Sequence, residues 1–139
     1  MTGASVTAEP IDVNAVLTSL AHPRAGAQSI FLGVVRNHDP SVHGEVAALE
    51  YSAHPDAQVV LEGILHDSSG AQGVHQLSAV HRVGRLAVGE TALVVAVAAE
   101  HRGQAQALCH GVVEAIKEQL PVWKKEILTD GSHAWVGWS

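Results

Sequence analysis

The chain has 139 residues, of which 47% are hydrophobic and 16% charged, which excludes a disordered tail and allows a domain with its own core. Eight Lys and Arg against fourteen Asp and Glu give a formal net charge of −6, which argues against binding nucleic acid or an anionic membrane. No apolar run reaches the ~18 residues of a membrane-spanning helix, and the N-terminus lacks a signal pattern. We therefore expect a soluble, cytoplasmic protein with a single domain over residues 1–139, of which residues 1–25 are the least diagnostic.

The first half of the chain predicts helices alternating with strands. Residues 12–21 are typical of a short helix, and residues 26–36, rich in Ile, Val and Phe, of a strand. The polar residues 37–44 predict a loop, and residues 45–52 a further strand. A second helix is expected to begin near Pro55. The apolar residues expected near one face of that helix are Val59, Val60, Leu61 and Ile64.

The second half predicts more strands and one long helix. Residues 74–90 contain two short strand-like pieces separated by glycines, and residues 91–100 are apolar almost throughout, as in a strand covered on both faces. Residues 121–128 and 133–138 predict extended chain. Because strands and helices are mixed without strict βαβ alternation, we expect an α+β fold with a mixed or antiparallel sheet.

The three lysines, Lys117, Lys124 and Lys125, fall within nine residues near the end of the long predicted helix. Residues 102–120 repeat apolar positions at steps of three and four, an amphipathic pattern that Pro121 ends. Lys117 falls about 100° from the centre of the apolar stripe, so its stem can be buried while its ammonium reaches a cleft. A basic patch on an acidic protein suits a small anionic ligand or an anionic chain end. A solubilising helix end is the alternative.

Other polar positions point to anion binding more than to a metal. His101 and Arg102 lie where the long helix is expected to begin, which favours an anion site over a solvated loop. Arg36 ends a predicted strand just before a loop, a frequent functional position. No two of the ten histidines stand at i, i+2 or i, i+4, so no metal site is predicted. Cys109, on the apolar stripe, predicts a buried thiol. Trp123 predicts either core or oligomer packing, or a wall beside the neighbouring lysine.

Six segments, in this order, resemble one known family. They are FLGVVR (31–36), LEY (49–51), HRVGRLAVGE (81–90), AEHR (99–102), IKEQLPVWKKE (116–126) and DGSHAWV (130–136). The combination resembles the large, catalytic subunit of molybdopterin synthase, the MoaE family, over roughly residues 26–136. The resemblance implies an α/β-hammerhead fold and a homodimer at the centre of a heterotetramer.

The resemblance also implies a sulfurtransferase of molybdenum cofactor biosynthesis. A small ubiquitin-like sulfur carrier would thread its C-terminal Gly-Gly thiocarboxylate into a pocket, and sulfur would pass to cyclic pyranopterin monophosphate to form the dithiolene of molybdopterin. By motif match, Lys117 and Lys124 are the expected catalytic residues, the first for proton handling or acyl acceptance and the second for stabilising negative charge. The expected substrate-pocket residues are Phe31, Val34, Val35, Arg36, His101, Arg102, Lys125 and Glu126. No metal or cofactor is implied for the site.

Two other functions remain open from the residues alone. One is a non-catalytic module that binds the anionic tail of a ubiquitin-like partner, and the other is an unrelated enzyme acting on a small phosphate ester. The leading hypothesis requires five side chains to meet around one pocket of the biological assembly. They are Arg36, His101, Arg102, Lys117 and Lys124. The segment SAHPDA (52–57) departs from the more acidic and aromatic run usual in the family.

Overall fold

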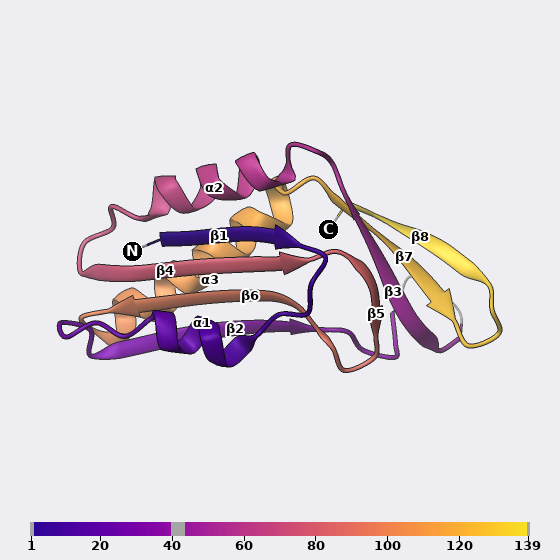
Figure 1. Ribbon diagram of the computed structural model, residues 1–139, viewed down its shortest axis with the longest axis horizontal. Coiled ribbons are helices and arrows are strands. Elements are labelled where there is room, and N and C mark those ends of the chain that lie inside the picture. The colour runs from indigo at the N-terminus through magenta and orange to yellow at the C-terminus, as the bar shows by residue number, and fades with distance from the viewer. Residues whose placement is uncertain (1, 40–43, 139) are drawn as a thin grey trace.

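The computed structural model describes residues 2–39 and 44–138 and confirms the mixed α+β architecture (Figure 1). Its described elements, in chain order, are β1 (Thr2–Thr7), α1 (Val13–Ser19), β2 (Ala27–Val34), β3 (Val46–Ala53), α2 (Ala57–Ser68), β4 (Val74–Arg82), β5 (Gly84–Ala87), β6 (Thr91–Ala99), α3 (Arg102–Gln119), β7 (Val122–Leu128) and β8 (His133–Trp138). The strands form two four-stranded sheets, ordered β1-β4-β6-β2 and β5-β3-β7-β8. Only the β1–β4 pair among these is parallel.

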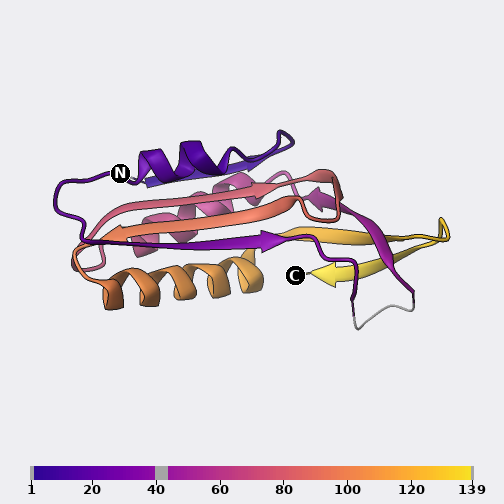
Figure 2. The ribbon, with the colours of Figure 1, turned by 90° about the horizontal axis from the view of Figure 1, so that it is seen from below.

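The first sheet is a central layer with helices on both faces. Strand β6 is buried from Ala92 to Ala99, as its unbroken apolar sequence predicts. Its odd-numbered residues pack into one core with α2 and α3, and its even-numbered residues Val94, Ala96 and Ala98 pack against α1. Figure 2 shows α1 and α3 on opposite sides of this sheet. The edge strand β2 carries three exposed apolar side chains, Ile30, Leu32 and Val34.

The second sheet extends from one end of the first, as Figure 1 shows. Its central strands β3 and β7 are antiparallel, with Tyr51 opposite Lys124 and Leu49 opposite Glu126. Strand β7 follows α3 after only Leu120 and Pro121, because proline cannot continue the helix. The C-terminal end of α3 is therefore placed at the junction of the two sheets.

Helix α3 is the long amphipathic helix that the sequence predicts, and it ends one residue earlier, at Gln119. Its buried side chains lie at three- and four-residue steps and pack on the first sheet. They are Ala105, Cys109, Val112, Val113 and Ile116. Lys117 follows Ile116 on the exposed shoulder of this stripe, so the helix carries its amine to the sheet junction.

One strand was not predicted, one expectation is wrong, and part of one predicted loop lies outside the described residues. Strand β1 lies in the N-terminal region that carried no diagnostic pattern, and it pairs with β4. On α2 the prediction for Val59 is wrong: its side chain is 68% exposed, because the buried face is set by Leu61, Ile64 and Leu65. Residues 40–43 of the predicted loop 37–44 lie outside the described residues. Within the described ranges, no helix is long and apolar enough to cross a membrane.

Candidate active site

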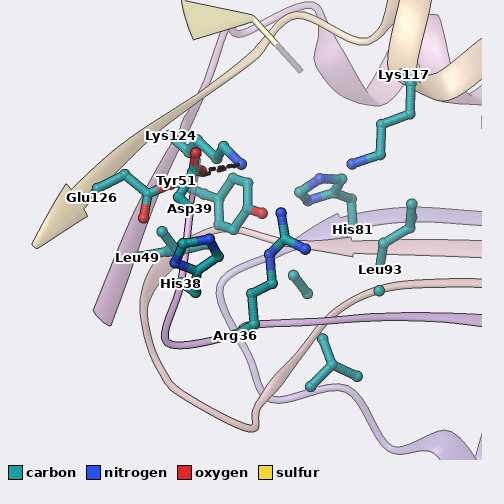
Figure 3. Close-up of a pocket in the computed structure, with 13 residues that line it drawn as sticks. Arg36, His38, Asp39, Leu49, Tyr51, His81, Leu93, Lys117, Lys124 and Glu126 are labelled. Atoms are coloured by element: carbon teal, nitrogen blue, oxygen red, sulfur yellow. Dashed lines mark ion pairs between the residues drawn. The ribbon is translucent and has the colours of Figure 1, made fainter. Parts of the chain in front are cut away.

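A polar cavity of about 130 Å³ lies where the two sheets and the C-terminal end of α3 meet (Figure 3). Its charged lining comes from three parts of the chain. These charged residues are Arg36 after β2, Asp39 beyond it, Lys117 on α3, and Lys124 and Glu126 on β7. Val34, at the end of β2, also lines the cavity. The structure thus brings together both lysines predicted to be catalytic and the arginine predicted to bind substrate.

The alternation of strand β7 decides which of its charges face the cavity. Lys124 and Glu126 are two residues apart and point to the same face, whereas Lys125 points to the opposite face. There the Lys125 ammonium lies 3.6 Å from a Glu50 carboxylate oxygen and 5.5 Å from the centre of the Trp135 ring. Lys125, predicted as a pocket residue, is therefore not part of the cavity lining.

Lys124 is flanked by two carboxyl groups. Its Nζ lies 3.6 Å from Asp39 Oδ2 and 3.8 Å from Glu126 Oε1. Burial, together with a hydrogen bond and repulsion from Asp39, raises the pKa of Glu126 to about 7, although Lys124 and Arg36 oppose the shift. A substantial fraction of Glu126 therefore keeps its proton near neutral pH, beside the Asp39 carboxyl group.

Lys117 has a different environment. Burial of the amine and the positive charge of Lys124 both lower the pKa of Lys117, and Glu114 opposes the shift. Near the cavity this lysine faces the imidazole of His81 rather than a carboxylate (Figure 3). A larger fraction of Lys117 is therefore the neutral amine, the form that can act as a base or a nucleophile.

Sequence reasoning assigned no role to four polar residues in the lining, which are His38, Asp39, Tyr51 and His81. Tyr51 and His81 lie within two of the segments that carry the family resemblance, but only the pairing of the strands shows that they face the lysines. Tyr51 is directly opposite Lys124 in the β3–β7 register. Burial and the nearby Glu126 raise the pKa of Tyr51 to about 12, so its phenol stays protonated.

Two other predicted pocket residues lie elsewhere. Val35 points into the hydrophobic core, being 3% exposed, because alternation along the chain turns it away from Val34 and Arg36. Phe31 lines a separate groove of about 280 Å³ between β2 and α3, together with Cys109 and Val113. Cys109 is a buried thiol, as predicted, with its Sγ 3.6 Å from the carbonyl oxygen of Val95.

His101 and Arg102 are distant from the cavity within one chain. They begin α3, whereas Lys117 lies near its other end, about 24 Å away along an ideal helix axis. Both residues line another cavity, of about 550 Å³, next to Gly26 and Glu100. The predicted convergence of five residues is therefore met within this chain by Arg36, Lys117 and Lys124 alone.

Two further sequence hypotheses concern Trp123 and a metal ion. Trp123 does not belong to the cavity lining, so the described structure gives no support to its role as a wall beside Lys124. Among residues 2–39 and 44–138, no group of three or more His, Cys, Asp or Glu side chains is arranged to hold a metal ion. The cavity is thus a cluster of three cations and two acids with protonatable side chains around it.

Comparison with known proteins identifies relatives that align along most of the chain. The sequence model of the MoaE protein family matches residues 6–119. The chain is 36% identical over 134 residues to the molybdopterin synthase catalytic subunit of Aspergillus niger, covering 94% of this chain and 72% of that protein. It is 33% identical to catalytic subunit 1 of Mycobacterium tuberculosis, covering 95% and 88% of the two chains.

Solved structures give the same result for the fold. Molybdopterin synthase from Staphylococcus aureus superposes with a TM-score of 0.85 at 32% identity, covering 95% of both chains. The MoaE protein of Burkholderia ambifaria superposes with a TM-score of 0.81 at 34% identity, covering 99% of this chain and 90% of that one. Since the family match spans most of the chain and the relatives align along nearly all of it, the chain belongs to the MoaE protein family.

Proposed function

We propose that this protein is the catalytic subunit of a molybdopterin synthase and that it transfers sulfur from a thiocarboxylated carrier to cyclic pyranopterin monophosphate. The observation that carries the proposal is the single cavity containing Arg36, Lys117 and Lys124. Both reactants are anionic, one through its cyclic phosphate and the other through its thiocarboxylate. A cluster of cations in a protein of net charge −6 suits such reactants.

The side chains of the cavity divide the chemistry among them. The guanidinium of Arg36 matches phosphate oxygens with two parallel N–H donors. Sulfur transfer requires the carrier's acyl group to leave the sulfur, so negative charge develops on the acyl oxygen, which the Lys124 ammonium would stabilise. Lys117, as the neutral amine, would either activate the water that takes the acyl group or accept that group itself before hydrolysis.

The size of the cavity supports a second protein chain at the site. Small-molecule sites commonly enclose at least about 300 Å³, and this cavity encloses about 130 Å³. A pterin bound here would extend beyond the surface of one chain. A homodimer would supply the missing wall, and the unused His101–Arg102 pair is the part of the chain best suited to contribute it.

The course of strand β2 supports a twofold arrangement of that kind. Its first residue, Ala27, is paired with Ala99, just before His101, and its last residue, Val34, lines the cavity. Two copies packed antiparallel along β2 would bring the His101 end of one copy to the cavity end of the other. In such an isologous interface the same patch is buried on both copies. The patch available for this is the exposed stripe of Ile30, Leu32 and Val34.

The dimer has its own test. We expect Leu32→Glu, which places a charge on the exposed stripe, to convert dimers to monomers in sedimentation velocity and to lower product formation. Val59→Glu, on the exposed face of α2, is the matched control and should remain dimeric. A monomeric wild-type protein, or a dimer unaffected by the charge at Leu32, would contradict this arrangement.

The proposed partner is a small ubiquitin-like carrier. A solved structure from Helicobacter pylori, described as a complex of subunits 1 and 2 of molybdopterin-converting factor, shares the fold of this chain at 19% identity and a TM-score of 0.77. A carrier tail ending in Gly-Gly is narrow enough to enter a small polar cavity, because glycine has no side chain.

Reconstitution tests the function directly. The purified chain is mixed with thiocarboxylated carrier and cyclic pyranopterin monophosphate, and molybdopterin is measured as product. We expect the wild-type protein to form product and Lys117→Ala to lose nearly all of it while remaining folded. Carrier binding without any product would indicate the non-catalytic binding module instead, and absence of carrier binding would reject both.

A further inference from the structure

His81 is a buried histidine in the cavity wall that none of the roles above uses. It lies near the end of β4 and is 4% exposed, one of two buried polar or charged side chains among the described residues. It lines the same cavity as Lys117 and Lys124. A buried imidazole within a reaction site requires an account of its charge and of both of its ring nitrogens.

The backbone fixes the tautomer of His81. Its Nδ1 lies 2.8 Å from the carbonyl oxygen of Arg82. A carbonyl oxygen can only accept a hydrogen bond, so Nδ1 carries the proton and donates it. Burial, reinforced by the positive charge of Lys117, lowers the pKa of His81 to about 4, so the ring is neutral at pH 7. In this neutral tautomer Nε2 has no proton and is a hydrogen-bond acceptor.

The ring is also held in its orientation. Tyr51 meets it edge to face, with the ring centres 5.1 Å apart and the planes at 76°. Such aromatic contacts are stabilising and directional. Beside the ring lies the amine of Lys117, which reaches down from α3 (Figure 3). A neutral ring in a fixed orientation therefore lies beside the side chain that is proposed to carry the chemistry.

We propose that His81 is a positioning residue for Lys117, whose amine donates an N–H to Nε2 and is thereby directed at the reacting atoms. The inference rests on the proposed function. Because an imidazole with so low a proton affinity is a poor base, it holds the amine without deprotonating it. An amine bound through one N–H keeps its lone pair available for a proton or an acyl carbon.

The contrast with Lys124 shows why a neutral acceptor suits this position. A carboxylate beside Lys117 would stabilise its ammonium form and raise its pKa, as opposite charges do. Lys124, flanked by Asp39 and Glu126, has that environment. The two lysines thus differ in their neighbours: two carboxyl groups lie within 4 Å of Lys124, whereas Lys117 is influenced by the cation Lys124 and, less strongly, by Glu114. His81 orients Lys117 without adding a negative charge.

Two substitutions separate positioning from structural support. In His81→Asn, the side-chain amide N–H can still donate a hydrogen bond to the Arg82 carbonyl oxygen, as Nδ1 does. In His81→Gln, the longer side chain can place its amide oxygen near the position of Nε2 and so replace the acceptor. We expect His81→Asn to be at least as stable as His81→Gln in urea. We expect the opposite order in kcat for product formation, with His81→Asn about 10- to 100-fold slower than wild type and His81→Gln closer to it. The KM for the pterin should change little, because Arg36 is retained.

A double-mutant cycle gives an independent readout. If His81 acts through Lys117, His81→Asn should cost no further activity in the Lys117→Ala background. The inference would be overturned if activity followed stability, so that His81→Asn were more active than His81→Gln. Additive losses of activity in the double-mutant cycle would also overturn it. Inactive wild-type protein would instead refute the proposed function.

Nitrogen NMR of the wild-type protein keeps the test valid even if both variants unfold. The inference requires a neutral His81 ring protonated on Nδ1 at pH 7. It also requires the Nε2 resonance to shift in Lys117→Ala. A charged ring, or a proton on Nε2, would overturn it.

Discussion

The carboxyl of Glu126 should make the stability of the protein depend on pH in a direction opposite to that of most acids. Its side chain is 2% exposed, and its pKa is raised from an ordinary value of 4.5 to about 7. Unfolding restores the ordinary value, so the unfolded state releases this proton at lower pH than the folded state does. Stability is therefore greatest below about pH 4.5 for this group and is lost as pH rises through 7.

The size of the effect follows from the same two values. Each pH unit between them corresponds to about 1.4 kcal/mol, so the full loss is about 3 kcal/mol, most of which falls between pH 5 and pH 8. Glu126→Gln keeps the shape and removes the titration. As pH rises from 5 to 8, the wild-type protein should therefore lose most of this ~3 kcal/mol of unfolding free energy relative to the Glu126→Gln variant.

Urea unfolding at pH 5, 6, 7 and 8, at a fixed protein concentration, measures the difference. Glu118→Gln, at an exposed position on α3, is the matched control and should retain the pH dependence of the wild-type protein. A Glu126→Gln variant whose stability varies with pH in parallel with wild type would show that the buried carboxyl does not hold a proton at neutral pH.

Three further predictions concern other parts of the molecule. Lys124→Ala should lower product formation far more than Lys125→Ala, because their side chains face opposite sides of β7; the reverse order in the reconstituted assay would contradict the site. Gln58→Ala should lower the free energy of unfolding in urea by about 1 to 3 kcal/mol. The Gln58 amide oxygen accepts a hydrogen bond from the Val6 N–H at 2.8 Å, and its amide nitrogen donates one to the Ala4 carbonyl oxygen at 2.9 Å. An unchanged unfolding midpoint would refute that role. Burial raises the pKa of the Cys109 thiol, so iodoacetamide should label it slowly in the native protein and quickly in urea, and equal rates would oppose its burial.

Periodicity predicted most of the elements because their apolar residues recur at regular steps. The continuous apolar run of β6 and the stripe of α3 each correspond to one observed element. Strand β1 could not be predicted in this way. It is a short edge strand whose position depends on pairing with β4 and on the amide of Gln58, both distant in sequence.

The site was predictable as a set of residues more than as a geometry. Motif resemblance pointed to Arg36, Lys117 and Lys124, and the structure places all three in the lining of one cavity. The resemblance placed Lys125 in the same pocket as Lys124, whereas the structure shows the two side chains on opposite faces of β7. Which face is turned to the cavity depends on the packing of the strand. The resemblance also could not single out His81, whose significance comes from its contacts with the Arg82 carbonyl and Tyr51.

The alternation of β7 also limits how the gene can change. One residue inserted within this strand just ahead of Lys124, with the pairing of Val122 to Ala53 retained, would turn Lys124 and Glu126 outward together and turn Lys125 toward the cavity. The same insertion in the turn between β7 and β8, at residues 129–132, would leave the order of side chains on β7 unchanged. We therefore expect length variation among functional descendants of this sequence to accumulate in that turn and to be absent from the strand.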